Sequence, residues 1–326
     1  MTYKAHVCTH YGEPRELVIK VLNAPEPGPA EVVIRNRAFT IGFPDLLTIQ
    51  GQYQRKPTCP FVPGSEFSGE IASVGADVSN FRPGDMVMGS VLLGAYAERV
   101  LARAEQCLAL PKAFDFARGA AFQVAYKTAY VGLVERGNLQ PGETVLVLGA
   151  AGGVGLAAVE LAKVLGAQVI AAASTDEKLK IASSMGADYE INYASGEFSQ
   201  RVKELTQGRG ADIIFDPVGG NCFDEAMHCI APFGRLLVIG FASGRIPTFA
   251  VNYALIKQVS IVGVRAGEFG RLDPEAGQRV TRALMHLAEN GKLHPSVHQR
   301  FPFNGVAAAF AAMQARAING RAVVEC

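Results

Sequence analysis

The sequence predicts an α/β protein of two domains, one a compact all-β unit and the other a doubly wound parallel sheet of six strands. Short apolar runs between Gly, Pro and Asp turns fill residues 1–125, and strands alternate with helical patterns over 126–265. This alternation is typical of a parallel sheet. The 326 residues also favour two domains over one. We expect one domain over 1–125, completed by 266–326, and a second over 126–265.

The first 125 residues have the pattern of a small all-β domain. Apolar runs occur at 32–34, 69–74 and 86–88, with turn-forming Pro-Gly pairs between them. Short strands at this spacing favour a barrel-like arrangement. From Phe116 to Leu133 the alanines recur with a period near 3.6, which predicts a helix.

The second domain is predicted from six apolar runs that alternate with helical patterns. After residue 270 we expect a helix, a short strand, another helix and a final strand that returns to the first domain. The expected strands are 145–149, 168–172, 188–191, 212–215, 235–240, 259–262, 299–301 and 321–325, and the expected helices are 177–185, 198–206, 274–290 and 305–315.

The turn after the first of these strands has the residues of a dinucleotide-binding loop. Gly152 would let the backbone approach a pyrophosphate, and Gly155 would let the following helix lie close to the strand. The helix N-terminus would offer free N–H groups and a positive dipole end to the phosphates. Ala150 stands at the first glycine of the usual motif, and Gly149 precedes it. The alternative is an ordinary glycine-rich turn between a strand and a helix.

Composition excludes several classes of protein. A net charge of +1 gives no electrostatic basis for binding nucleic acid. No apolar run approaches the ~20 residues of a membrane span, and the N-terminal residues lack the apolar core of a signal peptide. The six cysteines are scattered without a C-x-x-C pair. This pattern favours a reduced, cytoplasmic chain over a disulfide framework.

Six motifs spread over nearly the whole chain are specific enough to indicate a family. They are Val62–Gly69, Phe81–Val87, Thr128–Tyr130, Ala150–Gly155, Asp216–Gly220 and Gly234–Gly240. With these motifs the chain resembles the medium-chain dehydrogenase/reductase superfamily. Within it, the chain is similar to the zinc-independent quinone oxidoreductases, the group that includes zeta-crystallin. The resemblance implies a GroES-like β-barrel catalytic domain and a Rossmann dinucleotide-binding domain.

The resemblance also bears on metal chemistry. The positions of the catalytic zinc ligands in the superfamily fall at Gly42, Ser65 and Val124, and none of these residues binds zinc. Glu66 remains from the same motif, and we interpret it as a structural carboxylate. Without a metal to polarise an alcohol, the expected reaction is hydride transfer to an acceptor already activated by conjugation, such as a quinone or an enone.

The end of the second strand of the sheet favours NADPH over NADH. Enzymes specific for NAD place an Asp or Glu there, whereas this chain has Ala173. Similar enzymes use a Ser, a Lys and a Tyr in this region, which match Ser174, Lys178 and Tyr193. Thr175 offers a further hydroxyl. Charge-assisted hydrogen bonds from such groups suit a 2′-phosphate.

Three charged residues complicate this prediction. Asp176 and Glu177 would oppose NADPH if they pointed at its phosphate, and we interpret them as charges at the N-terminus of the next helix. Arg316 matches a C-terminal basic residue that reaches the phosphate end in similar proteins. The alternative for Arg316 is a solvated helix charge.

The remaining site residues follow from the resemblance and from the strand ends. Thr128 resembles the family Thr that holds the nicotinamide end. Tyr53, in the retained Gly-x-Tyr of the family, is the first candidate for a hydroxyl donor to the acceptor, and Lys127 is the second. The alternatives are a packed tyrosine and a solvated lysine. Further contacts to the cofactor are expected from Ala151, Gly152, Gly153, Val154, Phe241, Ala242, Gly263 and Val264.

We therefore expect a cytoplasmic, metal-free oxidoreductase that transfers hydride from NADPH to a small-molecule acceptor, a quinone or a related conjugated carbonyl. One alternative is an enoyl or 2-haloacrylate-type reductase. Another is a nucleotide-binding protein without relevant turnover. The apolar sixth strand pairs across a two-fold axis in similar proteins, which predicts a homodimer. No nucleic-acid or membrane partner is expected.

Overall fold

The chain folds into two compact units. A computed structural model describes residues 1–326, except for the side chain of Ser195. The first unit contains Met1–Gln123 and His294–Cys326, and the second contains Val124–Leu293. Among the described helices, none combines the length and the apolar composition needed to cross a membrane.

The first unit is built on a mainly antiparallel sheet. Its strands lie in the order β14-β15-β3-β4-β5-β7, with β6 paired to β3, and β14 and β15 are parallel. The final strand β15 pairs with β3, so the C-terminus returns to this unit as predicted. A separate two-stranded sheet is formed by β1 and β2. The strands of the unit are β1 (Thr2–Val7), β2 (Val18–Asn23), β3 (Glu31–Ile41), β4 (Glu66–Val74), β5 (Met86–Ser90), β6 (Arg99–Arg103), β7 (Cys107–Ala109), β14 (Val297–Pro302) and β15 (Arg321–Glu325).

Short helices close the first unit. The core lies between the sheet and these helices, and in it Phe39 of β3 stacks on Tyr96 with ring centroids 4.8 Å apart. The helices are η1 (Pro14–Glu16), α1 (Phe43–Ile49), η2 (Ala104–Gln106), α2 (Phe116–Ala120), η5 (Phe303–Gly305) and α11 (Val306–Gln314).

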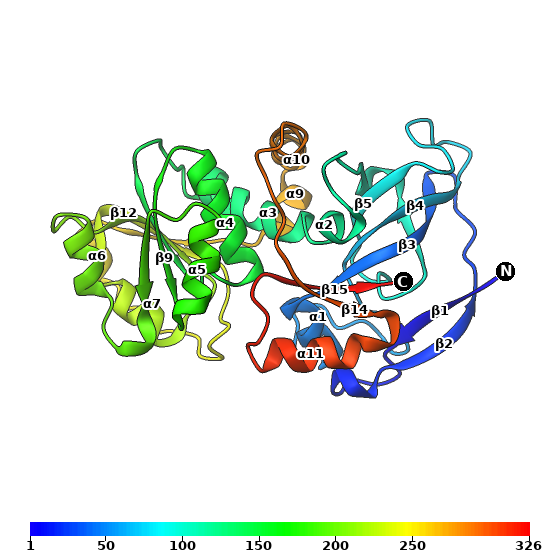
Figure 1. The fold of residues 1–326 in the computed structure, drawn as a ribbon, viewed down its shortest axis with the longest axis horizontal. Helices are drawn as coiled ribbons and strands as arrows, with labels where there is room; N and C mark the ends of the chain where they lie inside the picture. Colours follow the sequence, from blue (N-terminus) through cyan, green and yellow to red (C-terminus); the bar gives the residue numbers. More distant parts are fainter. The chain divides into compact units, whose positions relative to one another are not determined.

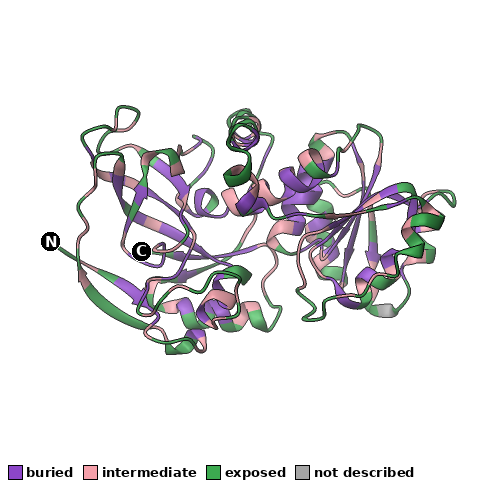
Figure 2. Cartoon of the chain, turned by 180° about the vertical axis from the view of Figure 1, so that it is seen from behind, coloured by how far each residue is buried: buried purple, intermediate pink, exposed green. Residues whose placement is uncertain are grey.

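The second unit is a parallel sheet of six strands in the order β10-β9-β8-β11-β12-β13. Helices cover both of its faces (Figure 1), so the central strands are buried on both sides (Figure 2). The predicted doubly wound sheet is therefore confirmed. Its strands are β8 (Thr144–Leu148), β9 (Gln168–Ala173), β10 (Tyr189–Asn192), β11 (Ala211–Asp216), β12 (Ile230–Val238) and β13 (Ser260–Gly263).

Ten helices of the described chain accompany this sheet, and one expected helix is divided. The pattern over 116–133 was expected to form one helix, whereas the structure has α2, α3 and the π-helix η3, because the chain passes from one unit to the other there. The helices are α3 (Gln123–Tyr130), η3 (Val131–Arg136), α4 (Gly153–Val164), α5 (Asp176–Ser184), η4 (Tyr193–Ser195), α6 (Ser199–Leu205), α7 (Gly220–Ala226), α8 (Asn252–Lys257), α9 (Ala266–Leu272) and α10 (Pro274–Glu289).

Two boundaries differ by five residues or more from the expectation. Strand β12 begins at Ile230 instead of 235, because an irregular register with β11 lets the strand run through Phe233, which has a φ of +63°. Residues 266–293, expected in the first domain, group with the second unit. There α9 packs on α10, so closely that a Cβ on Gly277 would lie 2.7 Å from the Cα of Gly270.

A buried ion pair joins the C-terminal strand to the rest of the first sheet. The guanidinium of Arg321 on β15 donates hydrogen bonds to the carboxylate of Glu66 on β4 and to the hydroxyl of Thr40 on β3, the latter at 2.6 Å. The Thr40 hydroxyl in turn donates to the Glu66 carboxylate at 2.8 Å. Glu66 is 1% exposed. The geometry therefore supports the interpretation of Glu66 as a structural carboxylate.

Replacing Arg321 by Ala is expected to lower the free energy of unfolding by about 3–5 kcal/mol, because the buried Glu66 carboxylate loses its guanidinium. Denaturant unfolding of the purified variant measures this loss. The matched control is Arg300→Ala on the neighbouring strand β14. Arg300 makes exposed ion pairs with Asp115 and Glu325, which contribute less than about 1 kcal/mol. Equal losses in the two variants would contradict the structural role of the buried pair.

Candidate functional site

The turn after β8 can be formed only with glycine at two positions. Gly149 has a φ of +58°, and a Cβ on it would lie 2.9 Å from the side chain of Val218. A Cβ on Gly155 would lie 2.3 Å from the carbonyl oxygen of Gly149. The usual motif has its first glycine at the position of Ala150. Here Gly149, one residue earlier, adopts the left-handed conformation. Helix α4 is seated directly on the turn.

The first turn of α4 presents backbone N–H groups at the carboxyl end of β8. Gly152 is the N-cap and is exposed, and Gly153 and Val154 are half-buried. Ala151, just before them, is 4% exposed. The first N–H groups of a helix have no acceptor within it, and the helix dipole adds positive charge there. This end of α4 can therefore bind an anionic phosphate.

The end of β9 brings a hydroxyl and an ammonium group together. The strand ends at Ala173, as expected, and the side chain of Ala173 is buried. The hydroxyl of Thr175 caps α5 by accepting a hydrogen bond from the Lys178 backbone N–H at 3.3 Å. This cap sets the direction of α5, and the Lys178 ammonium lies 3.4 Å from the hydroxyl of Ser174. The two groups together can bind a phosphate monoester.

One of the two carboxylates at the start of α5 is held by a residue that was not identified from the sequence. The side-chain amide of Asn192, at the end of β10, donates a hydrogen bond to Asp176 at 2.8 Å. Glu177 is exposed, and hydrogen bonds to its own backbone N–H and to the Thr175 hydroxyl lower the pKa of its carboxyl group. Tyr193 follows Asn192 and is half-buried, with its ring centroid 6.3 Å from that of Phe198. The position of Asn192 at the end of the neighbouring strand was the signal available in the sequence.

Asp216 shapes the next loop along the sheet edge. It ends β11 and is 1% exposed, and burial raises the pKa of its carboxyl group. The carboxylate accepts hydrogen bonds from the backbone N–H groups of Val218 and Gly219, both at 2.8 Å. These bonds hold the tight turn that places the side chain of Val218 against Gly149. The motif containing Asp216 was recognised in the sequence, but this role was not.

The loop after β12 is hydrogen-bonded to the loop that Asp216 shapes. The N–H of Ala242 donates to the carbonyl of Pro217 at 3.1 Å, and the ring of Phe241 lies 3.0 Å from where a Cβ on Gly219 would be. Ala242 is exposed and Phe241 is half-buried. Both therefore stand at the carboxyl edge of the sheet, where ligands bind in folds of this kind.

The end of β13 completes this edge. The carbonyl of Gly263 accepts a hydrogen bond from the side chain of Arg136 at 3.3 Å. The N–H of Val264 donates to the carbonyl of Val238 on the neighbouring strand at 3.0 Å, and Val264 is buried. The structure thus brings the ends of β8, β9, β11, β12 and β13 to one edge of the second unit.

Helix α3 carries Lys127 and Thr128 in the same unit. It is attached to α4 by the hydroxyl of Tyr126, which donates to the buried carboxylate of Glu160 at 2.5 Å. Thr128 is half-buried. Burial lowers the pKa of the Lys127 ammonium, which makes it a stronger acid. The sequence analysis did not anticipate the Tyr126–Glu160 contact, because the two residues are 34 positions apart.

In the first unit, the space beside Gly42 is occupied by Asp45. The Gly42 N–H donates to the Asp45 carboxylate at 3.0 Å, and a Cβ on Gly42 would lie 2.9 Å from the same oxygen. The absence of a side chain at Gly42 makes room for this carboxylate. Burial raises the pKa of Asp45 to about 7, against the opposing effects of Tyr96 and Arg321.

Tyr53 and Arg316 also belong to the first unit. Tyr53 is half-buried in the loop after α1, and its backbone N–H donates to the carbonyl of Leu47 at 3.0 Å. Arg316 follows α11, is exposed and has a φ of +57°. Its N–H donates to the carbonyl of Met313 at 3.0 Å. The side chains of Tyr53 and Arg316 thus reach solvent from the first unit.

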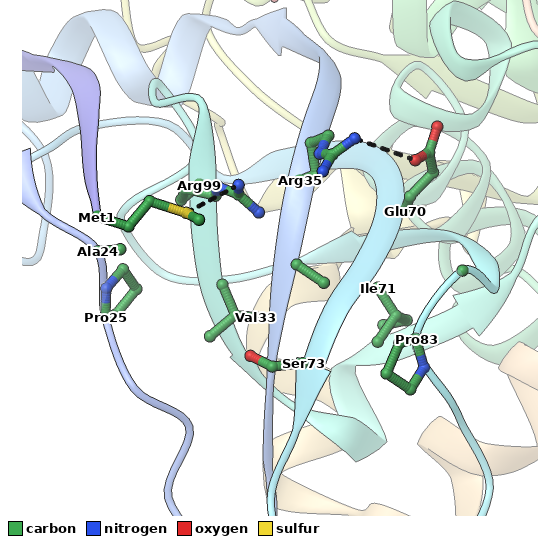
Figure 3. Close-up of a pocket in the computed structure, with 12 residues that line it drawn as sticks. Met1, Ala24, Pro25, Val33, Arg35, Glu70, Ile71, Ser73, Pro83 and Arg99 are labelled. Atoms are coloured by element: carbon green, nitrogen blue, oxygen red, sulfur yellow. Dashed lines mark hydrogen bonds and ion pairs between the residues drawn. The ribbon is translucent and has the colours of Figure 1, made fainter.

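A hollow of about 490 Å³ in the first unit contains none of the predicted site residues. Figure 3 shows it between Met1, Arg35, Ser73 and Arg99. The Arg99 guanidinium lies 3.5 Å from the sulfur of Met1. We place the candidate site at the sheet edge of the second unit, because most of the predicted cofactor-binding residues lie there.

Comparison with known proteins shows the family to which the chain belongs. Residues 28–112 match the family described as alcohol dehydrogenase GroES-like domain, and residues 153–292 match the family described as zinc-binding dehydrogenase. The quinone oxidoreductase-like protein 2 homolog of Nematostella vectensis is 38% identical over 99% of this chain and 89% of its own length. The chain belongs to the medium-chain dehydrogenase/reductase superfamily, in its quinone oxidoreductase group.

Two bacterial relatives support the same assignment. A quinone oxidoreductase of Pseudomonas aeruginosa is 36% identical over 96% of this chain and 97% of its own. The Escherichia coli quinone oxidoreductase, solved in complex with NADPH, has a TM-score of 0.89 and 27% identity, with 100% of both chains covered. The predicted GroES-like and Rossmann folds are confirmed.

The positions at which the sequence resemblance places zinc ligands are Gly42, Ser65 and Val124, and none of these residues binds zinc. In the described part of the chain, no three His, Cys, Asp or Glu side chains are grouped so that they could hold a metal ion.

Proposed function

We propose that the chain is an NADPH-dependent oxidoreductase that transfers hydride, without a metal, to a quinone or a related conjugated carbonyl compound. The observation that carries this proposal is the end of β9. There Lys178 and Ser174 lie 3.4 Å apart, Ala173 replaces the usual carboxylate, and Asn192 engages Asp176. This arrangement favours a 2′-phosphate over a free ribose hydroxyl.

The residues of the second unit fit the two halves of the dinucleotide. The N–H groups at the start of α4 would bind the pyrophosphate, because a glycine N-cap leaves them accessible. The groups of this unit assigned to the 2′-phosphate are Ser174, Thr175, Lys178 and Tyr193, and the role of Arg316, in the first unit, stays a prediction from the sequence. The groups assigned to the nicotinamide half are Thr128, Phe241, Ala242, Gly263 and Val264. When bound, the cofactor supplies the hydride.

The acceptor needs a donor for the negative charge that develops on its oxygen. Tyr53 offers a hydroxyl, and the Lys127 ammonium offers a proton whose release burial makes easier. A conjugated carbonyl is already polarised, so one hydrogen-bond donor replaces the Lewis acid that an alcohol dehydrogenase requires. The empty ligand positions at Gly42, Ser65 and Val124 agree with this chemistry.

The reaction is tested by a substrate panel after exhaustive chelation. NADPH oxidation is expected with 1,4-quinones, at a rate that chelation leaves unchanged. Preferential turnover of simple enones would identify a reductase of carbon–carbon double bonds instead. NADPH binding without turnover of any acceptor would identify a nucleotide-binding protein. Stoichiometric zinc that is lost together with activity would refute the metal-free mechanism.

Cofactor discrimination is tested by two substitutions. Lys178→Ala is expected to weaken the binding of NADPH by about ten- to a hundred-fold, because a charge-assisted contact contributes roughly 1.5–3 kcal/mol. The binding of NADH is expected to stay nearly unchanged. Ala173→Asp is expected to invert the preference, because it adds repulsion for the phosphate and an acceptor for the ribose. The measurement is kcat/KM for both cofactors at low ionic strength. Lys180→Ala, an exposed lysine on the same helix, is the control. Wild-type preference for NADH would contradict the assignment.

We also propose that the protein is a homodimer joined through β13. This strand is at the end of the six-stranded sheet, so its outer backbone groups are available for pairing. The preceding segment exposes Val251, Leu255 and Ile256, each at least 70% accessible. Light scattering at micromolar concentration is expected to give twice the chain mass of 34.6 kDa. A monomeric mass would refute this assembly.

A further inference from the structure

Two cysteines of the first unit that are 51 positions apart meet in space. Cys8 follows β1 and pairs with Phe61: its N–H donates to the Phe61 carbonyl at 2.8 Å, and the Phe61 N–H donates back at 3.1 Å. Cys59 stands two residues before Phe61 and packs on the same hydrophobic core as Cys8. Cys59 lies close enough to Cys8 to help raise the pKa of its thiol. The backbone pairing therefore brings the two cysteines together on one side of the core.

The two thiols differ in their access to solvent. Cys8 is 1% exposed, and its thiol donates a hydrogen bond to the carbonyl of His10 at 3.0 Å. Burial, with the neighbouring Cys59, raises the pKa of Cys8 to about 11, so Cys8 remains protonated at neutral pH and reacts slowly with an oxidant in solution. Cys59 is half-buried between the exposed residues Thr58 and Pro60. An oxidant in solution therefore reaches Cys59 first.

We propose that Cys8 and Cys59 form an oxidisable dithiol, a modification site at which a peroxide converts the pair to a disulfide. In the first step, the Cys59 sulfur takes one oxygen from the peroxide, whose O–O bond breaks, and becomes a sulfenic acid while water or an alcohol leaves. In the second step, the Cys8 sulfur attacks the Cys59 sulfur and the S–O bond breaks. The hydroxyl leaves with the Cys8 proton as water. Two electrons pass from the two sulfurs to the peroxide.

The disulfide would tether the loop that carries Tyr53. Residues 51–59 already contact the segment 8–11, because the Tyr11 hydroxyl donates a hydrogen bond to the carbonyl of Pro57 at 2.5 Å. The Tyr11 ring also packs on Gly51, where an added Cβ would lie 2.9 Å from it. A covalent bond at Cys59 would restrain this loop further. The formation of the bond does not depend on the proposed function, whereas its effect on turnover does.

The bond is tested by mass spectrometry on the full-length protein. After treatment with a small excess of hydrogen peroxide, free thiols are alkylated and the protein is digested. The peptide holding Cys8 is expected to be linked to the peptide holding Cys59, and dithiothreitol is expected to release both. The link is expected to be absent in Cys59→Ser and in Cys8→Ser. It is expected to persist in Cys222→Ser, which changes a cysteine of similar exposure in the other unit.

Chemical trapping tests the order of the two steps. In Cys8→Ser, Cys59 is expected to stop at the sulfenic acid and to react with dimedone, whereas wild type is expected to give little of this adduct. The proposal would be overturned if wild-type Cys59 remained alkylatable, or if it accumulated as sulfinic acid to the same extent as in Cys8→Ser. If Cys8→Ser does not fold, wild type and Cys59→Ser still decide the question.

Turnover is a separate readout. Oxidised wild type is expected to show a changed KM or kcat for the acceptor, restored by dithiothreitol, and oxidised Cys59→Ser is expected to show no such change. Identical kinetics before and after complete disulfide formation would overturn the tether. If no acceptor is turned over at all, the proposed function fails while the linked peptides still establish the disulfide.

Discussion

The proposed nucleotide site depends on the close contact between helix α4 and the turn after β8. The carbonyl of Gly149 lies where any side chain at residue 155 would have to be, so the helix can approach only with glycine there. The same turn requires a positive φ at Gly149, and the side chain of Val218 covers that residue. The direction of the α4 N–H groups is thus set by backbone packed against backbone, and a side chain at either glycine would prevent this packing.

The loops around this seat are fixed by hydrogen bonds from polar residues at strand ends. Asp216 holds the loop after β11, and backbone bonds attach the loop after β12 to it. At the end of β9, Asn192 engages Asp176, and the Thr175 cap directs α5 so that Lys178 meets Ser174. Each of these bonds positions a group that would otherwise sample several conformations. The selectivity proposed for the cofactor depends on these residues as much as on the residues that would contact the phosphate.

The first unit uses buried charge in a different way. The buried Glu66 carboxylate is paired with the Arg321 guanidinium and accepts a hydrogen bond from Thr40. The Asp45 side chain occupies the space beside Gly42. Asp45 contacts Gly42, and Glu66 follows Ser65, which are two of the positions at which the sequence resemblance places zinc ligands. The chain therefore fills this region with an internal polar network. Cys8 and Cys59 lie in the same unit, beside the loop that carries Tyr53. The proposed disulfide between them would restrain that loop.

The sequence by itself determined the elements whose signal is local. Hydrophobic periodicity located the six strands of the second unit and the return of β15, the small-residue turn located the nucleotide loop, and the end of β9 at Ala173 followed from the apolar run before it. The tertiary structure alone decided the pairings between distant residues: Glu66 with Arg321, Tyr126 with Glu160, Asp176 with Asn192 and Cys8 with Cys59. It also decided that α9 and α10 pack in the second unit. Periodicity reports which face of a segment is buried, whereas the partner on that face is set only when the whole chain has folded.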